Sequence, residues 1–307
     1  MRVLITGGAG FIGSHIVDLL LAGGHEVLVV DNLSTGKAEN VNRQAKLVHL
    51  DIGDPALIDV AREFRPDAIS HLAAQASVAV SMTDPIKDAQ TNIMGGLNVY
   101  RAAVESNCRQ FIYITTGGAL YGTPDYLPCD EEHPIRPMSA YGLSKWTLEQ
   151  YLKILLPADI PLKVLRLANI YGPRQDPYGE AGVIAIFAAR MIQDEPVYIF
   201  GDGEQTRDFV YVGDVARAHD LAMQSDEPVT VNISSATPLS VNELFELMAE
   251  NTGYQQEAVY QDERAGDIKH SVLSNERAKQ ALGWEPKTSM VNGLRETLDW
   301  VRQSDQQ

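Results

Sequence analysis

A tyrosine and a lysine four residues apart form the pattern most able to do chemistry in this 307-residue chain. Tyr141 and Lys145 lie in the segment YGLSK, and positions i and i+4 of a helix share one face. A nearby ammonium group favours the phenolate, so we expect Lys145 to lower the pKa of Tyr141 below its usual value of about 10. Such a tyrosine can take the proton of a hydroxyl group while a neighbouring oxidant takes hydride from the same carbon.

A glycine-rich segment near the N-terminus indicates what that oxidant is. Residues 6–13 read TGGAGFIG and fit the pattern G-x-G-x-x-G between a strand and a helix. Glycines let the backbone approach a pyrophosphate closely, and the helix N-terminus supplies N–H groups and partial positive charge. Asp31 follows Gly13 by 18 residues at the end of the next strand, where a carboxylate accepts the ribose hydroxyls of NAD and repels the 2′-phosphate of NADP.

Elements of regular structure must hold these two motifs side by side. We predict strands at 3–5, 26–31, 46–50, 67–71, 111–114 and 162–167, and helices at 11–21, 55–64, 86–106 and 140–152. The apolar runs in these strands are continuous and do not alternate in polarity, which is typical of a parallel sheet covered by helices on both faces. We therefore predict an α/β fold with a Rossmann-type doubly wound parallel sheet, which binds ligands at the carboxyl ends of its strands.

The pattern changes after residue 168. Pro, Gly and Asp become frequent, and short strands mix with isolated helices. We predict an NAD-binding domain over residues 1–168 and a smaller mixed α/β, nucleotide-sugar-binding lobe over 169–307, with some of its strands returning to the main sheet. Ser240 and Glu243 form a capping box for a helix that runs to about Asn251. Ser274 is predicted to cap another helix that ends at Gly283.

Composition excludes several classes of protein. With 25 Lys and Arg against 41 Asp and Glu, the net charge is −16 and no basic run is present, so nucleic acid is not an expected partner. Two cysteines fit a reducing compartment, and no apolar stretch approaches the ~18 residues that span a bilayer. We expect a cytoplasmic protein without a membrane partner, and the seven histidines show no metal-ligand spacing.

Taken together, the motifs resemble the extended short-chain dehydrogenase/reductases that act on nucleotide sugars, above all the branch that epimerises UDP-glucose at C4. Besides residues 6–14, 31 and 141–145, the matching segments are HLAAQ (71–75), TTGGALYG (115–122), RLANIYGPR (166–174), RDFVYV (207–212) and RAGD (264–267). The resemblance spans nearly the whole chain. It implies 4-epimerisation of UDP-glucose and UDP-galactose by transient oxidation at C4, a role in galactose metabolism, and a homodimer that pairs the helices around 92–106 and 140–152.

The resemblance also implies a role for individual residues. Tyr141 would be the base and acid, and Lys145 would bind the nicotinamide ribose. The NAD would be lined by Gly7, Gly10, Phe11, Ile12, Asp31, Asn32, Asp51, Ile52, Leu72, Ala73, Ala74, Asn92, Tyr141 and Lys145. On the substrate side, Asn169 would contact the diphosphate, Arg207 and Arg264 would clamp it, and the remaining contacts would come from Gly182, Val183 and Ser271.

The chain departs from the family pattern after the fifth predicted strand. Gly117 stands where many members carry Ser or Thr, so we predict that Thr116 bonds the reacting hydroxyl instead. The acidic residues that dehydratases and decarboxylases need are replaced by Gly118 and Ala119, which favours simple epimerisation. Ser271, seven residues beyond Arg264, is small enough to leave room for an N-acetyl group, and we expect UDP-N-acetyl sugars to be accepted as well.

Two alternatives remain open at this stage. The first is another nucleotide-sugar enzyme on the same scaffold, a UDP-glucuronate or UDP-pentose 4-epimerase. A sugar acid would need a further cation, which the sequence does not place. The second is a non-catalytic NAD-sensing protein, for which we would expect a lost Tyr–Lys pair.

Overall fold

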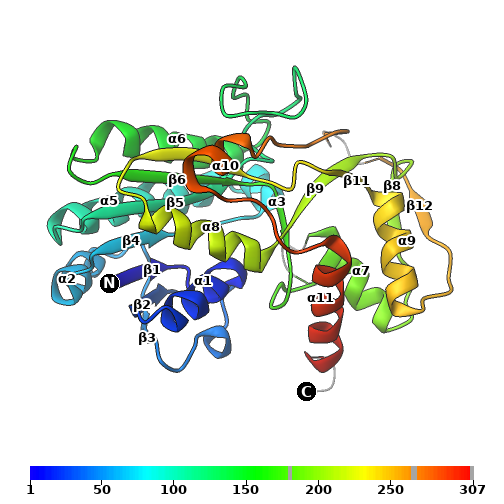
Figure 1. Cartoon of the computed structure of the whole chain (residues 1–307), viewed down its shortest axis with the longest axis horizontal. Helices are drawn as coiled ribbons and strands as arrows, with labels where there is room; N and C mark the ends of the chain where they lie inside the picture. Colours follow the sequence, from blue (N-terminus) through cyan, green and yellow to red (C-terminus); the bar gives the residue numbers. More distant parts are fainter. Residues whose placement is uncertain (179–181, 264–267, 305–307) are drawn as a thin grey trace.

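A seven-stranded parallel sheet is the centre of the molecule in a computed structural model that describes residues 1–178, 182–263 and 268–304. The strand order is β10-β6-β5-β4-β1-β2-β3 (Figure 1). The strands are β1 (Arg2–Thr6), β2 (Glu26–Asp31), β3 (Lys46–His49), β4 (Ala68–His71), β5 (Gln110–Thr116), β6 (Leu162–Leu167) and β10 (Val229–Ile233). The predicted Rossmann-type α/β sheet is confirmed.

Helices cover both faces of this sheet. One face packs against α1 (Phe11–Ala22), α8 (Val212–Gln224) and α10 (Glu276–Leu282), and the other against α2 (Ala56–Phe64), α5 (Gly96–Glu105) and α6 (Ala140–Leu155). Successive strand residues point to opposite faces: Val3 and Ile5 pack with the α1 side, and Leu4 packs with the α2 side. Burial on both faces explains the continuous apolar runs of the central strands.

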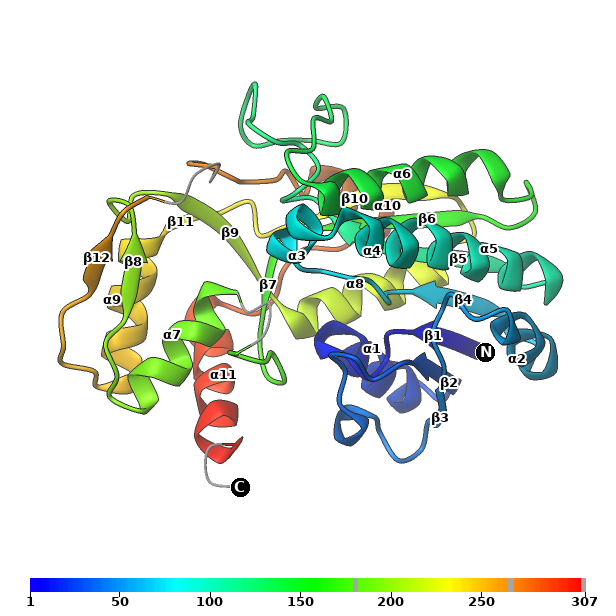
Figure 2. The same ribbon diagram turned by 180° about the vertical axis from the view of Figure 1, so that it is seen from behind.

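A smaller lobe follows the sheet along the chain. Its core contains Phe187, Leu244 and Leu298, which come from α7 (Val183–Ile192), α9 (Val241–Thr252) and α11 (Met290–Ser304). Two small sheets complete the lobe, one of β11 (Pro238–Ser240), β9 (Thr206–Tyr211) and β7 (Asn169–Tyr171), the other of β12 (Val259–Gln261) and β8 (Tyr198–Phe200). The lobe is therefore mixed α/β, and it lies beside the sheet in both views (Figures 1 and 2).

The chain returns from this lobe to the main sheet. Strand β10 pairs in parallel with β6, where Val231 lies opposite Leu165, and α8 packs against α1. The capping box at the start of α9 is confirmed: Ser240 Oγ accepts from the Glu243 amide, and the Glu243 carboxylate accepts from the Ser240 amide. The cap predicted for α10 is misplaced by one residue, because Asn275 precedes the helix while Ser274 Oγ accepts only a long bond from the Glu276 amide (3.4 Å).

The helix predicted over residues 86–106 is interrupted. A short helix α3 (Val78–Thr83) comes first, then α4 (Pro85–Ala89), a π-helical turn η2 (Gln90–Gly95) and α5. A 3-10 turn, η1 (Ala38–Asn40), follows β2. A π-helical turn inserts an extra residue and is common at functional sites. Here it rotates the residues before and after it relative to one another, which periodicity along the sequence does not reveal.

Candidate active site

The glycine loop after β1 is shaped for close backbone approach. Gly7 has φ +76°, and a Cβ there would lie 2.6 Å from the amide nitrogen of Ala73. A Cβ at Gly13 would overlap the carbonyl oxygen of Gly7. Gly10 precedes α1 without a side chain to cap it, so the first-turn N–H groups of α1 are left for a ligand. This cradle fits the pyrophosphate of a dinucleotide.

Three predicted NAD-binding residues, Asp31, Asn32 and Asp51, meet at the carboxyl ends of β2 and β3. Asp31 is buried, and its carboxylate accepts from the amides of Ala9 (3.0 Å) and Leu33 (2.8 Å). Asn32 Nδ2 donates to Asp51 Oδ2 at 2.7 Å. Asp31 is therefore fixed to the glycine loop by the Ala9 amide. Asn32 and Asp51 hold each other in place through their side-chain hydrogen bond.

The loop after β4 closes the other side of the cradle. The amides of Leu72 and Ala73 each donate to the Thr6 carbonyl at 3.1 Å, and Thr6 Oγ1 lies 2.8 Å from His71 Nδ1. Burial lowers the pKa of His71 to about 3, so this imidazole is neutral. The other predicted cofactor residues lie nearby in sequence: Phe11 and Ile12 in the first turn of α1, Ile52 after Asp51, and Ala74 after Ala73.

The structure gathers Tyr141, Lys145 and Thr116 at the carboxyl end of β5. Ser139 caps α6 by accepting from the Gly142 amide at 3.1 Å, and a Cβ at Gly142 would overlap the Ala119 carbonyl. The first turn of α6 therefore packs directly on the turn after β5. In that turn Thr116 Oγ1 accepts from the Ala119 amide at 3.1 Å.

Lys145 is anchored below this turn. Its Nζ donates to the Ile114 carbonyl at 3.0 Å and lies 4.5 Å from the centre of the Tyr113 ring. Burial lowers the pKa of Lys145 to about 7. The ammonium is thus held by one carbonyl and one aromatic face in a largely dry environment.

The expected lowering of the Tyr141 pKa is not provided by the chain alone. Burial raises that pKa to about 12, and the negative charge of Asp88 adds to the rise. Desolvation penalises a phenolate, which explains the direction of this shift. Helical spacing alone does not account for this burial, and a lowered pKa of Tyr141 under the combined charges of Lys145 and an oxidised nicotinamide remains a prediction.

Asn92 uses its side chain within the protein. In the π-helical turn its Nδ2 donates to the Gln75 carbonyl (2.9 Å) and to Ser144 Oγ (3.1 Å), and its Oδ1 accepts from the Gln75 amide (2.8 Å). These bonds tie the loop after β4 to α6. A contact of Asn92 with NAD remains a prediction.

Sequence reasoning missed Asp88, a buried carboxylate on α4 that bonds Asn92. One signal was available. Asp88 and Asn92 are four residues apart, which places two polar side chains on one face of a predicted helix.

The predicted substrate residues fall into three groups. Asn169 begins β7 with its Oδ1 4.0 Å from the place of a Cβ at Gly118, beside the turn after β5. Arg207 Nη1 donates to the Thr206 carbonyl (2.9 Å), and the Ser271 amide donates to the same oxygen (3.1 Å). Gly182 and Val183 start α7. Arg264 lies outside the described residues.

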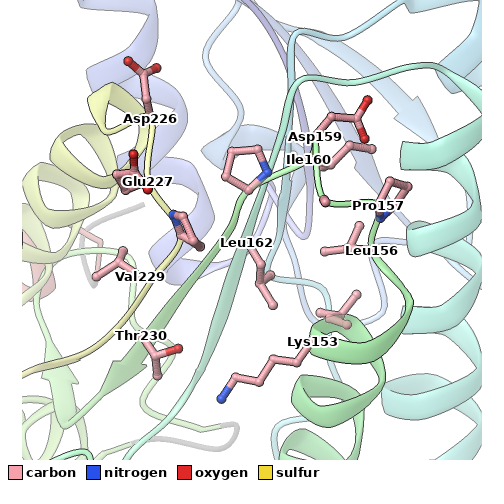
Figure 3. Close-up of a pocket in the computed structure, with 14 residues that line it drawn as sticks. Lys153, Leu156, Pro157, Asp159, Ile160, Leu162, Asp226, Glu227, Val229 and Thr230 are labelled. Carbon is pink, nitrogen blue, oxygen red and sulfur yellow. The ribbon is translucent and has the colours of Figure 1, made fainter.

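A cavity of about 530 Å³ lies elsewhere (Figure 3). Leu162 and Val229, the first residues of β6 and β10, line it together with Leu156 near the end of α6. These are the amino ends of the strands, whereas parallel sheets bind their ligands at the carboxyl ends. This cavity is therefore distinct from the candidate active site.

Among the described residues, no helix is long and apolar enough to cross a membrane. In that same part of the chain, no three His, Cys, Asp or Glu side chains are grouped so that they could hold a metal ion.

Comparison with known proteins defines the class. Residues 3–234 match the model of the NAD dependent epimerase/dehydratase family, and the chain belongs to this family. It is an NAD-dependent enzyme of the epimerase class, as the glycine cradle and Asp31 also indicate.

Three solved structures illustrate the similarity. The UDP-glucose 4-epimerase of Thermotoga maritima, solved with UDP-glucose, is 47% identical with a TM-score of 0.97, covering 99% of each chain. The UDP-glucose 4-epimerase of Thermus thermophilus, solved with NAD, is 44% identical (TM-score 0.92; 98% of this chain and 99% of that chain). The UDP-N-acetylglucosamine 4-epimerase from Methanobrevibacter ruminantium, in complex with UDP-N-acetylmuramic acid, is 34% identical (TM-score 0.94; 99% and 98%).

Proposed function

We propose that this protein interconverts UDP-glucose and UDP-galactose by NAD-dependent epimerisation at C4. The observation that carries the proposal is the meeting of Tyr141 and Lys145 with the turn after β5, where Gly118 and Ala119 provide no acidic side chain. Elimination or decarboxylation would call for such an acid. The similarity to two UDP-glucose 4-epimerases supports the same reaction.

Tyr141, Thr116 and Lys145 each have a separate role in the proposed reaction. NAD, when bound, supplies a centre that takes hydride from C4 and later returns it. Tyr141 takes the proton of the C4 hydroxyl and returns it to the oxygen after the ketone has presented its other face. Thr116 donates a hydrogen bond to that oxygen, while Lys145 holds the nicotinamide ribose.

The diphosphate must stay bound while the sugar turns. Asn169 and Arg207 are the proposed diphosphate contacts, because a guanidinium matches phosphate oxygens in shape and charge. Arg264 is the proposed second arginine, and Gly182 and Val183 are proposed to border the sugar. Small residues around the sugar, including Gly118, leave it free to rotate about the diphosphate.

We propose that N-acetyl sugars are accepted too. Ser271 is held by its amide beside Arg207, and its short side chain leaves volume for a substituent on C2. A similar protein is a UDP-N-acetylglucosamine 4-epimerase, which is consistent with this substrate range.

The decisive experiment is anaerobic incubation of the purified protein with UDP-sugars, without added NAD, followed by separation of the C4 epimers. UDP-glucose, UDP-N-acetylglucosamine, UDP-glucuronate and UDP-xylose form the panel. We expect turnover of the first two. Turnover of only the last two would move the assignment to the alternative epimerases, and protein that binds NAD without any turnover would favour a sensor.

Tyr141→Phe is the matched control for the chemistry. The ring and its packing remain, so bound NAD should be retained, while turnover should fall by about 10²–10⁴-fold, the usual contribution of a proton-transfer group. A mildly affected variant would refute Tyr141 as the base. Purified wild-type protein without NAD, and without affinity for it, would refute the whole proposal.

We further propose that the protein is a homodimer. Exposed apolar side chains on α3, α4 and α6 support this proposal, among them Met82 (60%), Ile86 (70%) and Ile154 (79%). These three helices pack against one another and lie on the same side of the sheet in Figure 2. Exposed apolar surface can mark an interface, and we propose that a second copy of the chain covers it.

A further inference from the structure

Asp88 is an ionisable group that the proposed mechanism does not use. It lies on α4 with 1% of its surface exposed, and its Oδ1 accepts from Gln75 Nε2 (2.9 Å) and Asn92 Nδ2 (3.0 Å). Burying a carboxylate is costly unless other groups compensate its charge. Its two hydrogen-bond donors are neutral amides, so a cation nearby is needed to make this burial favourable.

A chain of hydrogen bonds leads from Asp88 to Tyr141. Asn92 Nδ2, which donates to Asp88, also donates to Ser144 Oγ at 3.1 Å, and Ser144 Oγ donates to the Tyr141 carbonyl at 3.0 Å. Ser144 precedes Lys145 directly, and the π-helical turn sets Asn92 against α6. The carboxylate therefore holds the backbone turn that carries both residues.

The other ionisable groups around Tyr141 and Lys145 carry little net charge at neutral pH. They are His71 on β4, Tyr113 on β5 and Glu149 on α6. Burial lowers the pKa of His71 to about 3 and raises that of Tyr113, so both are neutral. Glu149 is paired with Arg166 (2.7 Å) and Lys153 (2.8 Å). Of the described groups around Tyr141 and Lys145, Asp88 is therefore the remaining anion. Its charge raises the pKa of both Tyr141 and Lys145.

We propose that Asp88 is a positioning residue for the Tyr141–Lys145 pair: it fixes the first turn of α6 through Asn92 and Ser144, and it is the counter-charge of the Lys145 ammonium. The side-chain hydrogen bonds of Asp88 run to Gln75 and Asn92 within the protein. The charge of the pair is thus set from a different helix. This inference rests on the proposed function only in so far as activity is used to measure it.

Asp88→Asn tests the charge separately from the hydrogen bonds, because an asparagine oxygen can still accept from Gln75 and Asn92. Without the negative charge, both Tyr141 and Lys145 lose protons at lower pH. We expect both limbs of the pH profile of kcat to move to acid by about half to one pH unit, with little change in KM. Asp84→Asn is the control, since it removes an exposed charge at the start of α4 and keeps an equally good cap.

A second readout does not depend on turnover. The near-ultraviolet absorption of the Tyr141 phenolate is obtained in the NAD-bound protein as the difference from Tyr141→Phe, and the same difference is taken in the Asp88→Asn background. The midpoint should move to lower pH with Asp88→Asn and stay in place with Asp84→Asn. An unchanged midpoint and an unchanged pH profile in folded Asp88→Asn would overturn the inference. If the wild type epimerises nothing, the proposed function fails while this titration still tests Asp88.

Discussion

The hydroxyl group of Thr116 makes one hydrogen bond inside the protein, and we propose that it makes a second one to the substrate. Thr116 Oγ1 accepts from the Ala119 amide, and in the proposed mechanism its hydrogen is donated to the C4 oxygen of the sugar. Thr116→Ala should lower kcat by about 10- to 100-fold, because a hydrogen bond to the developing charge is lost, while NAD content stays unchanged. The measurement is steady-state turnover of UDP-glucose.

The adjacent threonine offers a control at the same scale. Thr115 is buried, and its side chain lies on the same face of β5 as Tyr113, whose ring contacts Lys145. Thr115→Ala removes a hydroxyl that does not bond the reacting C4 oxygen in the proposed mechanism, and it should therefore lower kcat less than Thr116→Ala does. Wild-type turnover in Thr116→Ala would show that another group bonds the reacting hydroxyl.

At the scale of the elements, the turn between β1 and α1 has no room for added volume at Gly7. Gly7→Ala adds a Cβ 2.6 Å from the Ala73 amide at a residue with φ +76°. We expect a loss of stability of roughly 1–3 kcal/mol from backbone strain, together with loss of bound NAD. Thermal unfolding and the NAD released on denaturation measure the two effects.

Gly24→Ala separates the cost of the backbone angle from the cost of the overlap. Gly24 has φ +77°, but nothing lies within 4 Å of the place of its Cβ. This variant should lose about 1 kcal/mol and keep its NAD. Equal NAD content in both variants would argue against a pyrophosphate in the cradle.

At the scale of the whole molecule, the exposed apolar side chains of α3, α4 and α6 predict association. Ile154→Asp places a charge at the most exposed isoleucine among them and should convert a dimer to monomers in light scattering. Val291→Asp changes a residue of α11 that is also exposed (45%) and should leave the dimer intact. A monomeric wild type, or a dimer that persists in Ile154→Asp, would contradict the proposed interface.

The core also predicts how stability depends on pH. His219 on α8 is fully buried, with Nε2 2.7 Å from Ser70 Oγ on β4, and burial lowers its pKa to about 4. An unfolded histidine titrates near 6.5, so from pH 6.5 down to about 4 the unfolded chain takes up a proton that the folded protein does not. The contribution of the neutral His219 to the free energy of unfolding is complete above pH 6.5. It is lost between pH 6.5 and about 4, by up to about 3 kcal/mol.

Urea unfolding of the wild type and His219→Gln at pH 7 and pH 4.5 tests this. Glutamine can still bond Ser70 but does not titrate. The variant should have a lower free energy of unfolding than the wild type at pH 7. This difference between the two proteins should be smaller at pH 4.5. Parallel losses in the two proteins would assign the acid sensitivity to other groups.

Several features of the fold and site follow from local patterns along the chain. Uniform apolar runs identify the buried strands, the spacing of Gly7, Gly10 and Gly13 marks the cradle, and the interval of four places Tyr141 and Lys145 on one helical face. The capping box at Ser240 is equally local. Such features are readable because they depend on residues that are neighbours in sequence.

Other features arise only when distant segments meet. The π-helical turn sets Asn92 against Ser144, 52 residues away, and Thr206 brings Arg207 and Ser271 together from different parts of the chain. The protonation of Tyr141 also depends on distant segments. Helical spacing suggests a lowered pKa for Tyr141, but the packing of α4, β5 and α6 buries the side chain, and this burial raises its pKa. Desolvation is the sum of all surrounding atoms, so it emerges from the packed structure and not from any single motif.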